Sequence, residues 1–174
     1  MKWIFLIFFA FFVVPICSAK HNVTSKSSNH PYSKVEISKT NGGCSFHGSP
    51  VDYCDDRHIA AINEAILSQS PNFNGHYVLL SVPERENYYQ SSLVAIDSNT
   101  GIVYPLPIDF YSGHAGKKGG ADNLGKLTYS LDSNNVCIDG SIFVYRAEED
   151  GIFCFSLQGD RFTGHHTTYM DEDQ

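Results

Sequence analysis

The sequence predicts an α+β fold: a mostly antiparallel β-sheet meander with one N-terminal helix packed against it, stapled by disulfides. Three observations lead to this prediction. One stretch near residue 60 has helical periodicity, and most of the chain after it consists of short runs of β-branched and aromatic residues separated by Gly, Asp and Pro. Four cysteines lie beyond the first 19 residues, as in exported proteins with disulfides.

The first 19 residues have the three parts of a signal peptide. Lys2 supplies the positive charge, Trp3–Ile16 is an apolar stretch, and small residues precede a cleavage position after Ala19. An uncleaved anchor or a lipoprotein, lipidated at Cys17, is the alternative. Pro15 cuts the run short of the roughly 20 apolar residues of a membrane helix. We therefore expect a secreted or periplasmic chain with no membrane span after cleavage.

The remaining chain is expected to form one folded unit. The predicted segments are a flexible polar arm at 20–43, a single α+β domain at 44–169 and an acidic tail at 170–174.

The charge narrows the class of partner. The chain has 19 acidic and 12 basic residues, for a formal net charge of −7. This charge disfavours nucleic acid and anionic lipid as partners. It fits either a basic protein, such as a cell-wall enzyme, or no charged partner at all. No cofactor is predicted, and the sequence does not indicate an oligomeric state.

The cysteines after the signal segment are Cys44, Cys54, Cys137 and Cys154. Four cysteines allow three pairings, and we favour Cys44–Cys54 with Cys137–Cys154 because both are local. The first would tie a loop to the start of the helix, and the second would join neighbouring strands. Zinc is the alternative for four cysteines, but no C-x-x-C motif is present and the histidines do not cluster near the cysteines.

The helix is expected within "CDDRHIAAINEAILSQSP". Its apolar positions, Ile59, Ile62 and Ile66, are spaced as one helical stripe. Asp55 or Asp56 can cap its start, and Pro71 prevents its continuation.

The strands are expected after the helix, beginning with 76–82 and 92–96, which are joined to an edge segment at 102–107 by the turn "DSNTG". A strand at 126–131 and a meander follow. The expected turns of the meander are Asp139-Gly140, Asp150-Gly151 and Gln158-Gly159-Asp160. Alternation in "IFCFSL" places Phe153 and Phe155 on one face, with Ile152 and Cys154 on the other.

Two motifs resemble a group of small exported bacterial proteins, mostly uncharacterised. The first is an "NF-x-G-x-Y" strand, here Asn72, Phe73, Gly75 and Tyr77. The second is a "D-x-x-T-G-x-V-Y-x-L-P" hairpin, here Asp97, Thr100, Gly101, Val103, Tyr104, Leu106 and Pro107; Gly159–Phe162 is a weaker third match. The resemblance implies export and a β-rich fold rather than an activity. The chain departs from the group between the two strands, where it has "SVPERENYYQSS".

The hairpin motif itself is interpreted as structural. Asp97 and Thr100 are suited to bond turn backbone groups, and Gly101 to adopt a left-handed conformation.

Three segments supply the candidate binding residues. They are Tyr88 and Tyr89 in "ERENYYQ", Phe110 and Tyr111 in "DFYSG", and His114, Lys117 and Lys118 in the Gly-rich segment 112–125. Tyrosine is common at protein interfaces because it combines contact area with a polar tip. The competing interpretation of 112–125 is an ordinary mobile loop. The segment is not a phosphate loop, because no G-K-[ST] occurs in it.

No catalytic residue and no metal ligand is assigned with these candidates. A Cys–His nucleophile needs a free thiolate, and the disulfides account for all four cysteines. A serine nucleophile lacks its G-x-S-x-G turn. The predicted function is therefore a non-enzymatic exported protein-binding domain, in its specific form a periplasmic inhibitor or immunity protein against a cell-wall hydrolase.

Two alternatives remain at this stage. One is a small secreted hydrolase with a His/carboxylate site, with or without a metal, around His47, Asp52 and His58. The other is a structural protein of the cell envelope.

Overall fold

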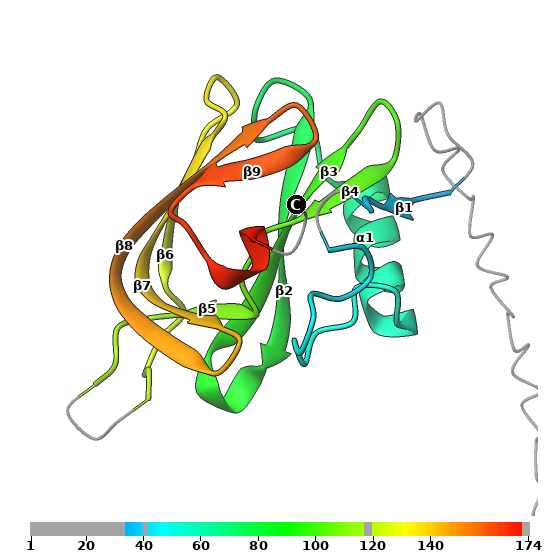
Figure 1. Ribbon diagram of the computed structural model, residues 1–174. Helices are drawn as coiled ribbons and strands as arrows, with labels where there is room; N and C mark the ends of the chain where they lie inside the picture. The colour runs from blue at the N-terminus through cyan, green and yellow to red at the C-terminus, as the bar shows by residue number, and fades with distance from the viewer. Residues whose placement is uncertain (1–33, 40–41, 117–119, 172–174) are drawn as a thin grey trace, which may run out of the picture.

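A computed structural model describes residues 34–39, 42–116 and 120–171 (Figure 1). The signal peptide expected at 1–19, most of the polar arm, and Lys117 and Lys118 lie outside the described residues. Among the described residues no helix is long and apolar enough to cross a membrane.

The single α-helix, α1, runs over Asp56–Ser68. Asp55 caps it, since its carboxylate accepts a 2.7 Å hydrogen bond from the backbone N–H of His58. The buried positions are His58, Ile62 and Ala65. Ile62 is buried as expected, but the other buried positions, His58 and Ala65, each come one residue before an expected isoleucine. The shift occurs because His58 has polar partners beneath the helix.

The chain forms one nine-stranded sheet with the order β1-β4-β3-β5-β7-β8-β9, with β2 on β3 and β6 on β7. The strands are β1 Glu36–Ile37, β2 Tyr77–Arg85, β3 Gln90–Asp97, β4 Ile102–Pro105, β5 Phe110–Ser112, β6 Lys126–Thr128, β7 Asn135–Val144, β8 Ala147–Gln158 and β9 Arg161–Gly164. Two 3₁₀ turns are η1, Glu86–Tyr88, and η2, Thr168–Met170.

The expected antiparallel meander is wrong in detail, because the sheet is mixed and curled. β1 pairs with β4 in parallel. β3 pairs with β2 along its length, and with both β4 and β5 through different residues. Figure 1 shows β7, β8 and β9 curving around to form a half-barrel, with η2 across its open side. Local strand signals do not specify this curl, because it depends on which strands share an edge.

β1 also changes the expected boundary of the folded domain. It lies within the predicted flexible arm, yet Ile37 is buried and the strand pairs with Ile102 and Val103. The edge strand β4 provides the unpaired backbone groups that this short segment uses.

Two of the expected turns are absent because β7 and β8 are single long strands. Gly140 and Gly151 lie directly opposite each other inside the ladder, and the chain instead reverses at Tyr145-Arg146. Both glycines have positive φ, at 156° and 159°. Glycine here marks a bend of a paired strand, which helps the sheet to curl.

Replacing Gly140 by alanine should destabilise the fold. Backbone strain alone should lower the free energy of unfolding by about 1–3 kcal/mol. A Cβ at this position would lie 2.1 Å from the carbonyl oxygen of Ser112, so the neighbouring strand would also have to move. Denaturant unfolding measures the effect, with Gly159→Ala as the control, since Gly159 has a positive φ but open space around it. Equal losses in the two variants would contradict the close approach.

The face predicted for the aromatic residues of β8 is confirmed. Phe153 and Phe155 are buried, whereas Ile152 is 70% exposed and Cys154 lies on the same outward face. Cys154 is paired with Cys137 in the β7–β8 ladder, with 4.1 Å between their Cα atoms. Both favoured disulfides, Cys44–Cys54 and Cys137–Cys154, are present. They indicate an oxidising, extracytoplasmic environment.

The hairpin motif has the structural role expected of it. The carboxylate of Asp97 accepts hydrogen bonds from the backbone N–H of Asn99, at 2.8 Å, and from the Thr100 hydroxyl, at 2.7 Å. Gly101 adopts φ 78°, the left-handed region. These contacts hold the turn between β3 and β4.

Candidate functional site

The aromatic residues predicted for binding separate into exposed and buried ones. Tyr88 and Tyr89, in and just after η1, are 61% and 46% exposed. Phe110 is buried on β5 beneath the guanidinium of Arg85, which lies 5.0 Å from the ring centroid. Tyr111 is not on the surface: it is fully buried, and its hydroxyl lies 2.7 Å from that of Ser81. Alternation along β5 turns Tyr111 to the face opposite Phe110.

His114, the predicted loop residue, is bound to the sheet rather than free at a loop tip. Its ring nitrogens lie 2.9 Å from a carboxylate oxygen of Asp150 and 2.8 Å from one of Asp139. These two hydrogen bonds raise the pKa of His114. The contacts anchor the start of segment 112–125 on the β7–β8 hairpin, so His114 is explained as a structural residue.

One end of the sheet gathers exposed aromatic and cationic side chains from segments far apart in the sequence. We call it the turn-end surface; its residues are Arg85, Tyr88, Tyr89, Tyr145 and Arg146. In Figure 1 the β2–β3 connection and the β7–β8 turn both lie at the lower end of the half-barrel. Arg85 and Arg146 line one cavity, which places the two connections next to each other.

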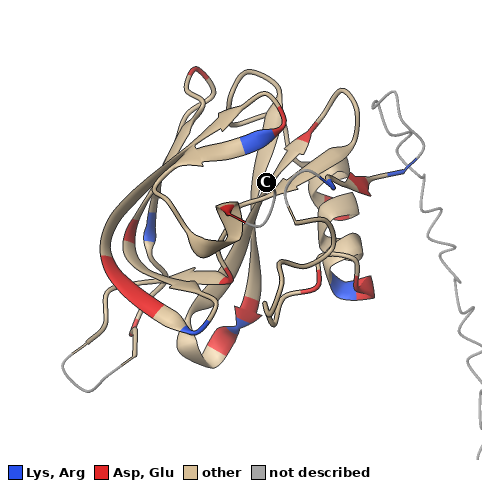
Figure 2. Ribbon diagram, viewed as in Figure 1, with Lys and Arg blue, Asp and Glu red and all other residues tan. Residues whose placement is uncertain are grey.

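This cavity has a volume of about 400 Å³. Its lining is Gly48, Pro50, Arg85, Asp109, Phe110, Phe143, Tyr145, Arg146, Ala147 and Glu148. The rings of Phe110 and Phe143 lie 5.9 Å apart, since these residues are paired across β5 and β7. The turn-end cavity therefore has an aromatic wall and charged groups of both signs, which Figure 2 shows side by side at the β7–β8 turn.

A hydrogen-bonded chain supports the cavity from beneath. The hydroxyl of Tyr169 accepts from the backbone N–H of Tyr145, at 3.0 Å, and donates to the carboxylate of Asp109, at 2.8 Å. Burial and the neighbouring Asp109 raise the pKa of Tyr169, so it remains a donor at neutral pH. Tyr169 also stacks on Phe46, with 4.7 Å between ring centroids. These contacts hold the β7–β8 turn against the body of the protein.

The turn is also conformationally strained. Tyr145 has φ 54° and Arg146 has φ 143°, values that residues other than glycine rarely adopt. Tyr89, at the other side of the surface, has φ 53°. Such backbone conformations persist only where the surrounding contacts enforce them, and they cluster at functional sites.

Of the five residues of this surface, the sequence predicts only Tyr88 and Tyr89 as binding residues. Tyr145 and Arg146 are missed because the turns expected at Gly140 and Gly151 place them inside a strand, and Arg85 lies in the predicted segment "ERENYYQ" without being one of its candidates. The sequence does contain one signal for this turn. At "VYRA" the alternation of apolar and polar residues along β7 and β8 is interrupted, although no glycine marks the position.

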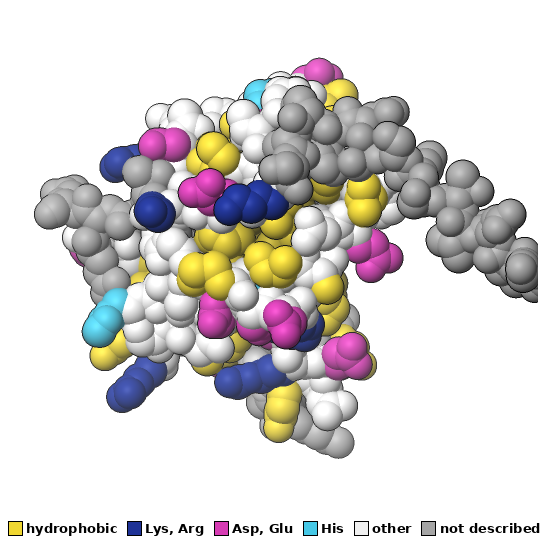
Figure 3. Space-filling view, turned by 90° about the vertical axis from the view of Figure 1, so that its right-hand side faces the viewer, with side chains coloured by type: hydrophobic (Ala, Val, Ile, Leu, Met, Phe, Trp, Pro, Cys, Tyr) yellow, Lys and Arg dark blue, Asp and Glu magenta, His cyan; other side chains and the backbone are white. Residues whose placement is uncertain are grey.

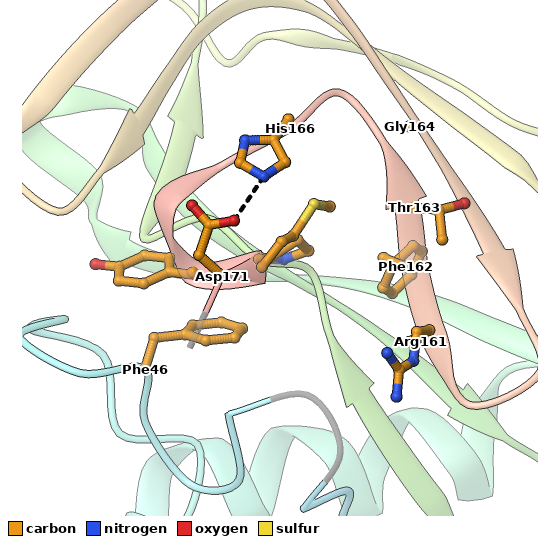
Figure 4. Close-up of a pocket in the computed structure, with 10 residues that line it drawn as sticks. Phe46, Arg161, Phe162, Thr163, Gly164, His166 and Asp171 are labelled. Atoms are coloured by element: carbon orange, nitrogen blue, oxygen red, sulfur yellow. Dashed lines mark hydrogen bonds and ion pairs between the residues drawn. The ribbon is translucent and has the colours of Figure 1, made fainter. Parts of the chain in front are cut away.

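A second cavity, of about 270 Å³, lies between β9 and the C-terminal segment (Figure 4). Figure 4 marks a hydrogen bond in this cavity between His166 and Asp171, whose Nε2 and Oδ1 atoms are 2.9 Å apart. Both side chains are about two-thirds exposed, at 67% and 66%. Thr163 lies apart from His166 across the cavity, so the hydroxyl, imidazole and carboxylate do not form a catalytic series.

Two residues of the alternative hydrolase site around His47, Asp52 and His58 differ sharply in exposure. His58 is 1% exposed and faces Glu84, whereas His47 is exposed on the loop before Pro50. In the described part of the chain, the one group with metal-ligand proximity is Cys44, Asp52 and Cys54. Its two sulfurs are bonded to each other, so they are not thiolate ligands.

His58 belongs to a buried ionic cluster instead. Its Nδ1 lies 2.9 Å from the carboxylate of Asp55, and its Nε2 lies 2.7 Å from that of Glu84. Glu84 also accepts from the hydroxyl of Ser92, at 2.6 Å, and pairs with Arg57. Neither cavity is lined by these residues. The cluster therefore ties α1 to β2 and β3 and has a structural role.

Figure 3 shows the face that carries α1, with hydrophobic side chains gathered near its middle and acidic and basic side chains around them.

The fold and the site together define a disulfide-stapled α+β protein with an aromatic and cationic surface at one end of a curled sheet. Compared with protein-family models, with curated proteins and with solved structures, the chain gives no match to any of them.

Proposed function

We propose that this chain is an exported, non-enzymatic binding protein that docks another protein through the turn-end surface. The observation that carries the proposal is the exposure of Tyr88, Tyr89 and Tyr145 in two connections that each place an arginine at the same cavity. Tyr and Arg are the residue types most enriched among interface hot spots, along with Trp. The hydrogen bond from the backbone N–H of Tyr145 to Tyr169 supports the same conclusion, because a turn that is already held loses less conformational entropy on binding.

The partner is proposed to be a basic protein of the cell envelope, and in the specific version a cell-wall hydrolase. The net charge of −7 favours long-range attraction to a basic partner. The disulfides are consistent with the periplasm or an extracellular space. An inhibitor or immunity protein would combine the acidic net charge, the disulfides and the turn-end surface. It would need no catalytic series of its own.

Replacing Tyr88, Tyr89 or Tyr145 by alanine should weaken the complex. Truncation of a hot-spot tyrosine costs about 2 kcal/mol or more, which is roughly a thirtyfold rise in Kd. The measurement is capture of partners from the envelope fraction by the full-length tagged chain, followed by titration of the purified complex with each variant.

Tyr129→Ala provides the matched control, since Tyr129 is 38% exposed and lies outside the turn-end surface. Retention of full affinity by all three turn-end variants would contradict this docking surface. Loss of affinity in Tyr129→Ala alone would move the interface to the β6 side of the molecule.

A further inference from the structure

The two arginines of the turn-end cavity lack carboxylate partners. Within the part of the chain that the structure describes, Arg57 pairs with Glu84 and Arg161 lies 3.8 Å from Asp160, but neither Arg85 nor Arg146 forms an ion pair. This is unusual for a chain in which acidic residues outnumber basic ones by 19 to 12. It is more unusual because Asp109 and Glu148 line the same cavity.

Both guanidinium groups are instead held over aromatic rings. Arg85 lies 5.0 Å from the centroid of Phe110, and Arg146 lies 5.7 Å from that of Tyr145. A guanidinium that stacks on a ring keeps its N–H groups directed outward in its own plane, where they are available to an acceptor. The rings therefore fix the two cations in the cavity without using their hydrogen-bonding capacity.

The acidic residues of the cavity have other roles. Asp109 is 4% exposed, and its carboxylate accepts a hydrogen bond from the hydroxyl of Tyr169. This bond partly compensates the buried carboxylate without a cation. Glu148 lies on β8 opposite Phe143 of β7, and its side chain is exposed. Neither carboxylate is close enough to either arginine to form an ion pair in the described structure.

We propose that the turn-end cavity binds a carboxylate group of a polypeptide, either an acidic side chain or the C-terminal carboxylate of the docked partner. The planar N–H pairs of Arg85 and Arg146 match the two oxygens of a carboxylate, and the wall formed by Phe110 and Phe143 accommodates its aliphatic stem. The proposal rests on the proposed docking function and specifies its central contact.

The two acidic residues make the cavity selective among anions. Asp109 and Glu148 repel any anion that enters, and the repulsion is larger for a doubly charged group than for a singly charged one. A carboxylate carries one charge, whereas a phosphate carries up to two near neutral pH. The cavity therefore favours a carboxylate over phosphate.

The test is an NMR titration of the full-length chain with short probe peptides at up to tens of millimolar, followed through the backbone amides of Tyr145 and Arg146. The probes are a pentaglycine peptide blocked at both ends with a central glutamate, its glutamine counterpart, and an all-glycine peptide with a free C-terminal carboxylate. Inorganic phosphate is the fourth probe. Saturable shifts with the glutamate peptide assign the site to a side-chain carboxylate, and shifts with the free C-terminus assign it to a chain end.

Replacing Arg85 or Arg146 by glutamine should weaken binding of the carboxylate peptide at least tenfold, since each variant removes a charge-assisted hydrogen-bonding group. Arg161→Gln is the matched control, because Arg161 is an exposed arginine that lines the other cavity. Equal shifts with the glutamate and glutamine peptides would overturn the proposal. Undiminished binding in both turn-end variants, or stronger binding of phosphate, would overturn it as well.

The result is separable from that of the docking experiment. If tyrosine variants abolish partner capture while no peptide carboxylate binds, the docking function stands and the carboxylate site is wrong. If carboxylate peptides bind through Arg85 and Arg146 while partner capture is insensitive to the tyrosines, the cavity is a carboxylate site and the proposed docking surface is wrong.

Discussion

Replacing His58 by alanine should lower the free energy of unfolding by about 3–5 kcal/mol, because it removes one partner of a buried ionic cluster. His58 is 1% exposed, and the side chain of Glu84 is 8% exposed. Without the imidazole, the carboxylate of Glu84 would keep Ser92 and Arg57 as partners. It would lose the 2.7 Å contact between its Oε1 and Nε2 of His58, which lies buried beneath α1. Urea unfolding of the oxidised protein measures the effect.

The charge state of His58 follows from its contacts. Both ring nitrogens lie within hydrogen-bond distance of carboxylate oxygens, Nδ1 of Asp55 and Nε2 of Glu84, and this arrangement favours the doubly protonated, cationic ring. Burial lowers the pKa of His58, but the hydrogen bonds to Glu84 and Asp55 outweigh burial and raise it above 6.5. Burial likewise raises the pKa of Glu84, and its bonds from His58 and Ser92 outweigh this and lower it below 4.5.

These directions determine the pH dependence of stability. The contribution of His58 is fully present below about pH 6.5 and is lost as the pH rises through its higher folded pKa. The contribution of Glu84 is present above about pH 4.5 and is lost as the pH falls through its lower folded pKa. The stability difference between the native chain and His58→Ala should therefore be largest between these two values.

His166→Ala is the matched control for burial. His166 also contacts a carboxylate at 2.9 Å, but its side chain is 67% exposed and its pair with Asp171 should contribute less than about 1 kcal/mol. A loss below about 1 kcal/mol in His58→Ala, or a difference that grows above pH 7, would contradict the buried imidazolium.

Removing the Cys44–Cys54 disulfide by a double alanine substitution should cost about 3 kcal/mol, and removing Cys137–Cys154 should cost a similar amount. The two cysteines of the first pair are 10 residues apart in sequence and those of the second 17, so the loop-entropy contributions differ little. Thermal or denaturant unfolding of the two double variants measures both losses.

The two disulfides should nevertheless differ in their local effects. The first constrains the loop that carries Phe46 against Tyr169 and Gly48 at the turn-end cavity. Cys137 and Cys154 lie in a ladder that backbone pairing already holds. Limited proteolysis should therefore cleave near residues 45–53 only in the variant that lacks the first bridge. Equal resistance of both variants would show that packing, rather than the disulfide, holds this loop.

Much of the fold could be predicted because its signals are local. The helix is located by its apolar spacing, and Asp55, one of the two caps predicted, is the one observed. The alternation in residues 152–157 correctly assigned the buried face of β8. The turn at Asp97–Gly101 and both disulfides were predicted from short separations in sequence, where few alternatives compete.

The site could be predicted only in part because its residues meet through strand pairing. Tyr88 and Tyr89 were selected as exposed aromatic residues, and they are exposed. Tyr111 is predicted for binding on the same grounds, but it is buried. The direction of a side chain on β5 depends on which face of the sheet curls inward, and the residue type does not reveal this. Arg146 was missed because the Asp-Gly pairs at 139–140 and 150–151 resemble turns, although they bend a continuous ladder.

The β-rich character, the single capped helix, the local disulfides and the acidic charge can all be read from the amino-acid sequence. Each follows from the preferences of neighbouring residues or from composition. The pairing of β3 with several strands, the curl of the sheet, and the cavity shared by Arg85, Arg146 and Asp109 are visible only in the folded protein. Those facts depend on pairings between residues tens of positions apart, whose energies reflect the packing of the whole sheet rather than any local stretch of the chain.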